Sequence, residues 1–163
     1  MTMNPGQKKI LALLNEVLTG ELTAINQYFL HAKMCDNWGF ARLGKIMYRE
    51  SIDEMHHAEW LVDRILLIGG VPNLQRLGKL NIGETVPEQL ESDLAIENNA
   101  IPLLNGGIEL CREHGDNATR ALLEKILTSE EEHRDWIESQ QELIAQVGVQ
   151  NYLTQQIRPD AAE

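Results

Sequence analysis

Two short stretches of the sequence place a glutamate and a histidine three residues apart. Glu54 precedes His57, and Glu130 precedes His133. Residues at this spacing lie on one face of a helix, so the carboxylate and the imidazole can bind the same metal ion. A single motif of this kind is common on helix surfaces and usually binds nothing. Its repetition makes it informative.

Each motif also follows a lone glutamate at the same distance. Glu21 lies 33 residues before Glu54, and Glu97 lies 33 residues before Glu130. The sequence therefore predicts two copies of one helix pair, each with two glutamates and one histidine.

The hydrophobic pattern predicts the helices that position these residues, because apolar side chains recur at steps of three and four. We expect four long helices and a short fifth one, at about residues 5–37, 40–68, 85–114, 117–147 and 151–157. The segment 71–86 has the length of a crossover between helices that run in the same direction. The predicted fold is an all-α four-helix bundle with one long crossover and a short fifth C-terminal helix, in a single domain over residues 1–163.

The paired glutamates lie within apolar stripes that should face the core. Four carboxylates there would repel one another and lose hydration worth several kcal/mol each, unless protons or cations compensate. No Lys or Arg lies on these stripes. We therefore predict two metal sites with three protein ligands each. Mixed carboxylate and imidazole ligation favours iron or manganese, while zinc or cobalt can bind in vitro.

Tyr28 lies two turns after Glu21 on the same helix face. Two interpretations are open: a group that hydrogen-bonds near the metal site or passes an electron, and a core tyrosine with a satisfied hydroxyl. The remaining aromatic and histidine residues are assigned simpler roles. We expect Trp38 and Trp136 to be packing residues, and His31, His56 and His114 to be surface or interface groups.

Met55 follows Glu54 by one residue, about 100° around the helix, so it cannot point at the same site. It shares a second apolar stripe with Tyr48, Ile52, Val62 and Leu66. A lone bundle would leave this stripe in water, which indicates a partner subunit. On spacing alone, a methionine there is interface filler rather than a ligand.

Composition excludes several function classes. The formal charge of −11 argues against nucleic-acid binding and suits a protein that attracts cations. The sequence has neither a membrane-spanning apolar run nor a signal-peptide pattern, so we expect a cytoplasmic protein. Cys35 and Cys111 form no metal or redox motif, and we assign them no function.

From Lys9 to Arg158 the sequence resembles the bacterioferritins. The resemblance is carried by Glu21 with Ala24 to His31, by Glu50 to His57, by Asn73 to Gln75 with Leu77 to Glu84, and by Gly148 to Leu153. It implies a ferritin-like subunit, assembled through two-fold dimers into a hollow shell of 24 copies that stores ferric mineral.

The resemblance also implies an activity and its residues. The activity is that of a ferroxidase, which oxidises Fe(II) to Fe(III) with O2 or H2O2. The implied ligands are Glu21, Glu54 and His57 for one iron and Glu97, Glu130 and His133 for the other, with Glu54 and Glu130 bridging. Met55 matches the axial ligand of a haem b shared between two subunits. A small ferredoxin that supplies electrons through the haem for iron release is the expected partner.

The sequence departs from the family at one place. Some members bind a further iron on the inner surface with a His and an Asp, and these positions are Arg49 and Asp53 here. Arginine has no free electron pair to offer a metal. We therefore hypothesise that iron passes through the di-iron centre into the cavity, with His133 as a mobile ligand.

Three other functions compete with this interpretation. A DNA-protecting mini-ferritin would need a basic tail and ligands shared between subunits, and a gel shift at physiological salt distinguishes it. A peroxide reductase on the same bundle would normally carry a rubredoxin-like cysteine site, which the sequence lacks. The chain can also be the haem-bearing subunit of a mixed ferritin shell, which native mass spectrometry of protein from its source would decide.

Overall fold

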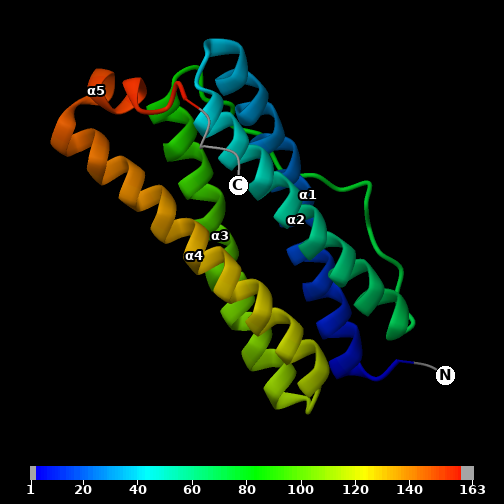
Figure 1. Cartoon of the computed structure of the whole chain (residues 1–163). Coiled ribbons are helices and arrows are strands. Elements are labelled where there is room, and N and C mark those ends of the chain that lie inside the picture. The colour runs from blue at the N-terminus through cyan, green and yellow to red at the C-terminus, as the bar shows by residue number, and fades with distance from the viewer. Residues whose placement is uncertain (1–2, 159–163) are drawn as a thin grey trace.

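The structure is a computed structural model that describes residues 3–158. Its helices are α1 (Pro5–Trp38), α2 (Ala41–Leu67), α3 (Val86–Glu113), α4 (Asn117–Val147) and α5 (Val149–Thr154). Two antiparallel pairs, α1 with α2 and α3 with α4, form the bundle (Figure 1). The crossover between α2 and α3 runs back along the bundle, so these two helices point the same way (Figure 1). The predicted fold class is confirmed.

The helix ends follow from local chemistry. Asn4 caps α1 and exchanges hydrogen bonds with Gln7, and Thr85 does the same with Glu88 at the start of α3, so each of these helices begins with a capping box. Gly39 ends α1 at a φ of 89°, a conformation that favours glycine. These caps fix both ends of α1 and the start of α3.

The fifth helix lies earlier in the chain than predicted. It spans Val149–Thr154 rather than 151–157. Gly148 ends α4 with a φ of 80° and also serves as the N-cap of α5. Because the glycine turns the chain in a single residue, the next helix begins at once.

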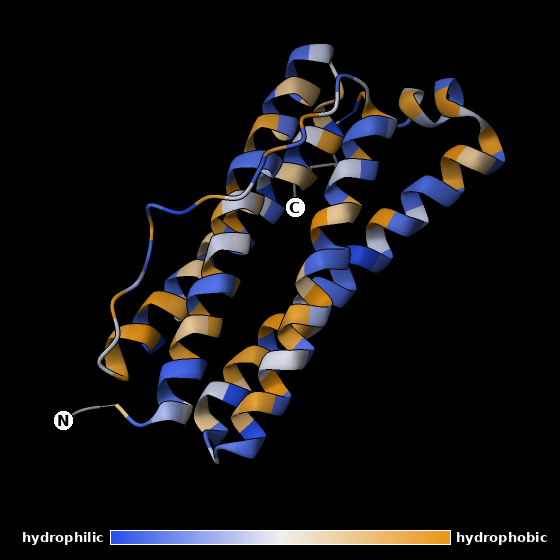
Figure 2. Cartoon of the chain, turned by 180° about the vertical axis from the view of Figure 1, so that it is seen from behind, coloured by the Kyte–Doolittle hydropathy of each residue, from blue (hydrophilic) through white to orange (hydrophobic). Residues whose placement is uncertain are grey.

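The bundle core consists of two apolar clusters. One lies near the N-terminus of α1 and includes Leu14, Leu61, Leu104 and Leu123. The other lies near α5 and includes Leu43, Leu90, Ile137 and Tyr152. Each long helix carries apolar side chains at both ends of its buried face, as the alternating colours of Figure 2 reflect. The predicted ligands occupy the layer between the two clusters.

Helix α3 continues through Pro102, which lies inside the helix predicted over residues 85–114. Gly107, one turn further on, allows the neighbouring helices to approach. A Cβ there would lie 2.4 Å from Leu13 Cδ2 and 2.9 Å from Leu123 Cδ1. Only glycine therefore fits this three-helix contact without displacing the two leucines.

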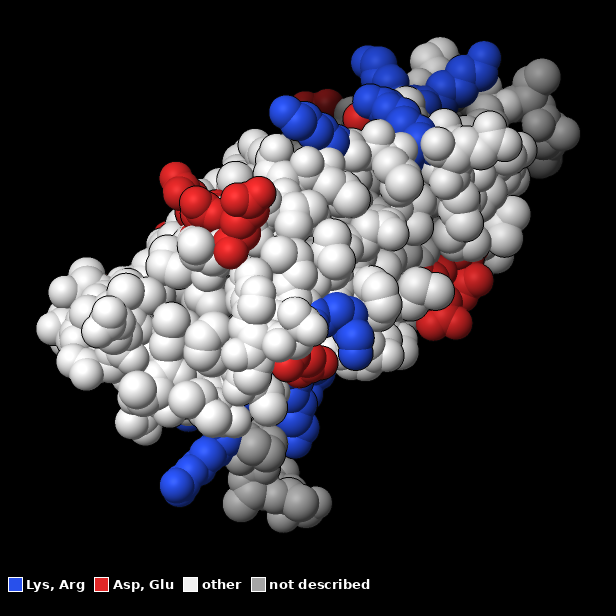
Figure 3. Space-filling view, turned by 90° about the horizontal axis from the view of Figure 1, so that it is seen from above, with Lys and Arg blue, Asp and Glu red and all other residues white. Residues whose placement is uncertain are grey.

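No helix within residues 3–158 is both long enough and apolar enough to cross a membrane. Figure 3 shows one face of the molecule, where Lys and Arg side chains gather at the upper right and along the lower edge, and acidic side chains form several patches. A broad uncharged area lies between these groups.

Candidate metal centre

The four helices of the bundle bring the predicted ligands into one buried layer. Glu21 comes from α1, Glu54 and His57 from α2, Glu97 from α3, and Glu130 and His133 from α4. All six side chains are buried, with residue exposures between 1% for Glu97 and 8% for His133. The repeated spacing in the sequence therefore corresponds to a single cluster in space.

The first half of the cluster surrounds His57. Its Nδ1 lies 3.0 Å from Glu130 Oε1, 3.1 Å from Glu54 Oε2 and 3.5 Å from Glu21 Oε2. The imidazole thus faces carboxylates from three different helices. Trp60, one turn further along α2, packs against the ring of His57 with centroids 5.5 Å apart.

The second half surrounds His133. Its Nδ1 lies 2.8 Å from Glu97 Oε1 and 3.8 Å from Glu50 Oε2. Tyr28 donates a hydrogen bond to Glu97 Oε1 and sets its ring edge-on to His133, with centroids 5.2 Å apart. The Tyr28 hydroxyl is therefore bonded to a predicted ligand within the core, which fits both interpretations of this residue.

The ligand atoms form two overlapping groups, and within each group they lie within 4.8 Å of one another. One group contains Glu21, Glu54, His57 and Glu130, and the other contains Glu54, Glu97, Glu130 and His133. Glu54 and Glu130 belong to both. Glu97 Oε2 is buried with no hydrogen-bond partner among the described residues, and Glu130 Oε1 has only the Nδ1 of His57, 3.0 Å away, beside it. Buried carboxylate oxygens that converge in this way fit a site for two cations.

Burial of so many carboxylates changes how they hold protons. Desolvation, together with the charge of Glu54, raises the pKa of Glu130 to about 10. Desolvation likewise raises the pKa of Glu54 well above its usual value. Burial alone would lower the pKa of His57, but its contacts with Glu130, Glu21 and Glu54 outweigh this and raise that pKa to about 12. The metal-free cluster therefore binds protons that metal ions must displace.

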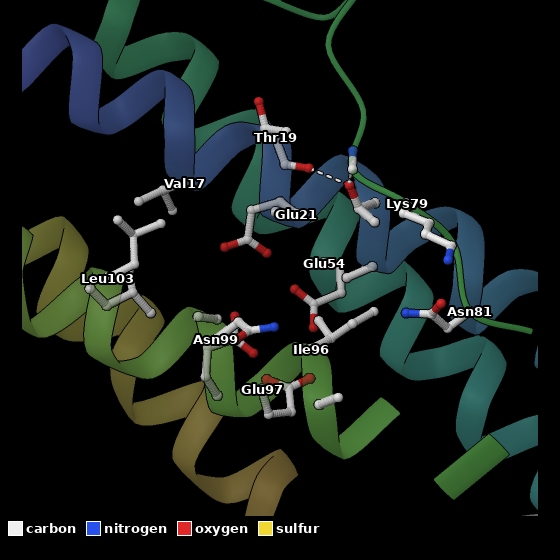
Figure 4. Close-up of a pocket in the computed structure, with 18 of the residues that line it drawn as sticks. Val17, Thr19, Glu21, Glu54, Lys79, Asn81, Ile96, Glu97, Asn99 and Leu103 are labelled. Carbon is white, nitrogen blue, oxygen red and sulfur yellow. Dashed lines mark hydrogen bonds between the residues drawn. The ribbon is translucent and has the colours of Figure 1, made fainter. Parts of the chain in front are cut away.

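A pocket of about 270 Å³ leads to the cluster between α1, α3 and the crossover. In Figure 4, Glu21, Glu54 and Glu97 point toward one another across it. Lys79 and Asn81 line the same pocket from the crossover and are exposed to solvent. The pocket thus connects the buried carboxylates with the surface.

Met55 lies on a different face of α2 from Glu54 and is 55% exposed. Tyr48, Ile52 and Leu66 of the same predicted stripe are exposed as well. Met55 therefore lies away from the carboxylate cluster. This agrees with the prediction that it cannot point at the same site as Glu54. The structure presents the side chain on a largely exposed apolar face, although Val62 of the stripe is half-buried against the core and the ring of Tyr48 contacts Phe29.

One expectation about the histidines is wrong. His31 is fully buried rather than at the surface, and its Nε2 accepts a hydrogen bond from Gly83 N. The reason is its place on α1, three residues after Tyr28 on the helix face that meets α3 and the crossover. His56 and His114 are exposed.

Two features near the site were not predicted. Glu50 lies beside His133, and burial raises its pKa. A tryptophan also follows each ligand histidine by three residues: Trp60 packs on His57, and Trp136 stacks on His133 with centroids 6.2 Å apart. The interval of three residues from histidine to tryptophan occurs twice in the sequence, and this repetition could have predicted that each tryptophan packs on its histidine. The predicted packing role of Trp136 agrees with this contact.

A four-helix bundle with a long crossover, a short C-terminal helix and a central carboxylate and histidine layer defines a class of metal-carboxylate proteins. Comparison with known proteins makes this specific. The model of the ferritin-like domain family matches residues 11–147.

Curated relatives extend the match over almost the whole chain. The bacterioferritins of Mycobacterium tuberculosis and Mycobacterium bovis are 55% identical over 150 residues, which cover 92% of this chain and 94% of theirs. The bacterioferritin of Streptomyces coelicolor is 46% identical over 158 residues, 95% of each chain. The chain therefore belongs to the ferritin family, and within it to the bacterioferritins.

Proposed function

We propose that this protein is a cytoplasmic iron store that oxidises Fe(II) at the buried cluster and keeps ferric mineral inside a shell of 24 copies. Membership of the bacterioferritins supports the iron-storage role. The observation that carries the proposed ferroxidase site is the convergence of six metal-binding side chains from four helices in two overlapping groups. The negative charge of −11 favours attraction of ferrous ions.

In this proposal ferrous iron is the substrate, and each ion has three protein ligands. Glu21, Glu54 and His57 bind one ion, and Glu97, Glu130 and His133 bind the other. Glu54 and Glu130 bridge the two, which their membership of both groups supports. The carboxylates neutralise the charge of the ions, and the histidines supply neutral nitrogen donors once their protons leave.

Oxidation of the two ions releases two electrons. Hydrogen peroxide accepts both with two protons and yields two water molecules, whereas dioxygen accepts both with two protons and yields hydrogen peroxide. Protons displaced from His57 and Glu130 by the arriving ions are available near the reaction, because both groups hold protons in the metal-free cluster. Tyr28 orients Glu97 through its hydrogen bond and is placed to pass an electron.

Ferric product then moves toward the inner cavity. We assign the first step to His133, which trades its contact with Glu97 for one with the partly exposed Glu50. Crystals soaked in ferrous iron should show metal-dependent conformers of His133. A fully occupied inner site coordinated beside Arg49 would contradict this route.

Met55 is the residue that would hold a haem b between two copies of the chain. A thioether on an exposed apolar helix face fits an axial ligand at a two-fold interface. The haem, when bound, supplies one-electron transfer for the release of iron. A small ferredoxin is the proposed donor of those electrons, and the shell consists of this chain alone or of this chain with another ferritin.

The test of the proposed site is aerobic oxidation of ferrous iron by the purified shell, compared between wild type and Glu97→Ala. Loss of one ligand should slow the fast phase by about tenfold or more. Glu132→Ala is the matched control, because Glu132 is an exposed glutamate of α4. Equal fast phases in wild type and Glu97→Ala would rule out the assigned centre.

A further inference from the structure

Three side chains of α1, spaced four residues apart, hold the crossover against the bundle. Each accepts a hydrogen bond from a backbone N–H of the crossover. The bonds run from Gly78 N to Thr23 Oγ1 (2.8 Å), from Asn81 N to Gln27 Oε1 (3.0 Å) and from Gly83 N to His31 Nε2 (3.0 Å). We call these three side chains, Thr23, Gln27 and His31, the clasp.

The clasp is itself fixed by α3. Gln27 Nε2 donates to Asp93 Oδ1 at 2.7 Å, and His31 Nδ1 lies 2.9 Å from the same oxygen. Because His31 Nε2 accepts from Gly83, the proton of a neutral imidazole lies on Nδ1, facing the carboxylate. Gln27, His31 and Asp93 are all buried. A buried polar network of this kind gives the crossover a defined position.

The end of the crossover has no room to shift toward α3. A Cβ on Gly83 would lie 2.3 Å from Gln89 N and 2.6 Å from Glu88 C. The backbone of the crossover therefore rests directly on the first turn of α3. His31 holds it there from the other side.

The clasped segment is also a wall of the pocket that leads to the carboxylates. Gly78, Lys79 and Asn81 line this pocket together with Glu21 and Glu54. Figure 4 shows Lys79 and Asn81 beside α1, on the side of the pocket that faces Glu54. Neither Gln27 nor His31 lines the pocket, so these two residues act on it through the crossover.

We propose that the clasp sets the width of the pocket mouth and thereby the rate at which metal ions reach the buried cluster. The inference rests on the proposed metal-binding function of that cluster. The clasp residues are positioning residues, since the six ligands remain in place when the crossover loosens. Weakening the clasp therefore accelerates entry and exit by the same factor and leaves the affinity unchanged.

The test measures binding of Co²⁺ alone to the purified metal-free shell, followed by visible absorption in a stopped-flow instrument. His31→Leu removes the acceptor for Gly83, and His31→Gln restores a side-chain acceptor. We expect association and dissociation to be about fivefold faster in His31→Leu, the effect of weakening one hydrogen bond. The dissociation constant should match wild type, and His31→Gln should return the rates toward wild type.

Thr128→Val is the matched control, because Thr128 is an exposed threonine of α4 that bonds only its own helix, at Glu124 O. It should leave both rates unchanged. Hydrogen exchange of the peptide that contains Gly78, Asn81 and Gly83 should be faster in His31→Leu, with exchange in α1 and α3 unchanged. If His31→Leu gives no folded protein, Gln27→Met makes the same comparison at the middle bond.

The outcomes separate the two proposals. Wild-type protein that binds no Co²⁺ would overturn the metal-binding function and the inference with it. Suppose that wild-type protein binds Co²⁺ and that His31→Leu folds with faster hydrogen exchange in its crossover. Unchanged rates of Co²⁺ association and dissociation in this variant would then overturn the clasp proposal alone. Lower affinity without faster exit in His31→Leu would also overturn it, because the variant would then have damaged the ligands.

Discussion

His57 faces three buried carboxylates, and this contact determines the state of the metal-free cluster. Four negative charges in a dry layer would repel one another strongly, so protons must occupy some of these groups. The raised pKa values of His57, at about 12, and His133, at about 9, show that contacts with carboxylates outweigh the effect of burial on both imidazoles. Metal ions and protons therefore compete for the same atoms.

This competition predicts how metal binding depends on pH. His57, His133 and Glu130 all have raised pKa values and hold protons at pH 7. Metal binding must release those protons, so the affinity should fall as the pH falls. Calorimetric titration of the metal-free protein with Co²⁺, in buffers of different ionisation enthalpy, should report about two or more protons released per subunit at pH 7. Equal affinities at pH 6 and 8 with no proton release would contradict this account.

Single residues also show what sequence reasoning can reach. The burial of the six predicted ligands follows from spacing, because a helix converts intervals of three and four into a shared face. The burial of His31 could have been predicted in the same way, because this residue follows Tyr28 by three on the same helix face. Its hydrogen bond with Gly83 could not, because the crossover has no periodic pattern to read. The hydrogen bond from Tyr28 to Glu97 was likewise one of two open interpretations.

At the scale of helices, caps and periodicity locate the elements well because both are local properties. Predicted and observed bounds of the four long helices differ by one residue or less at each end. The six-residue α5 is too short to show a period, so its start at Val149 depended on recognising the turn at Gly148. The length of the segment was enough to predict a crossover. Its hydrogen bonds to α1 could not be predicted from the sequence and are seen only in the structure.

The start of α4 gives a prediction at this scale. Asp116 caps the helix by accepting from Thr119 N and Thr119 Oγ1, and it also accepts from Arg64 Nη2 of α2 at 2.8 Å. Asp116→Ala removes the cap and the link to α2, and should lower the free energy of unfolding by about 1–2 kcal/mol. Asp116→Asn keeps a capping oxygen and loses the charge, so its loss should be smaller. Denaturant unfolding of the metal-free protein measures the free energy of unfolding of wild type, Asp116→Ala and Asp116→Asn.

The same site has a defined pH dependence. Burial alone would raise the pKa of Asp116, but hydrogen bonds from Thr119 and Arg64 outweigh this and lower it. A lowered folded-state pKa stabilises the protein fully above the unfolded value of about 3.9, and this stability is lost as the pH falls through the folded value. The gap between wild type and Asp116→Asn should therefore be constant near pH 7 and shrink below about pH 4. If the difference in free energy of unfolding between wild type and Asp116→Asn grew as the pH fell, it would contradict the lowered pKa of Asp116.

For the whole molecule, two faces of α2 carry the two proposed sites. Glu54 and His57 face the bundle, whereas Met55 and its apolar neighbours face outward from the described chain. An exposed face of this kind on an isolated subunit favours association between copies, and a two-fold axis would bring two Met55 side chains together. The proposed haem site would therefore be a property of a dimer, which neither the spacing within one chain nor its isolated structure can complete.

Met55→Leu should abolish haem binding and leave the iron chemistry in place. Leucine has nearly the volume of methionine, so the apolar face still packs, but it has no sulfur to bind haem iron. We expect haem absorbance to fall to background, with the shell mass from native mass spectrometry and the fast phase of ferrous oxidation unchanged. Met47→Leu is the matched control, because Met47 is buried beside Cys35, and it should retain haem. If Met55→Leu retained haem at wild-type occupancy, Met55 would not be a haem ligand. If the variant failed to assemble into a shell, Met55 would instead be a packing residue of the interface.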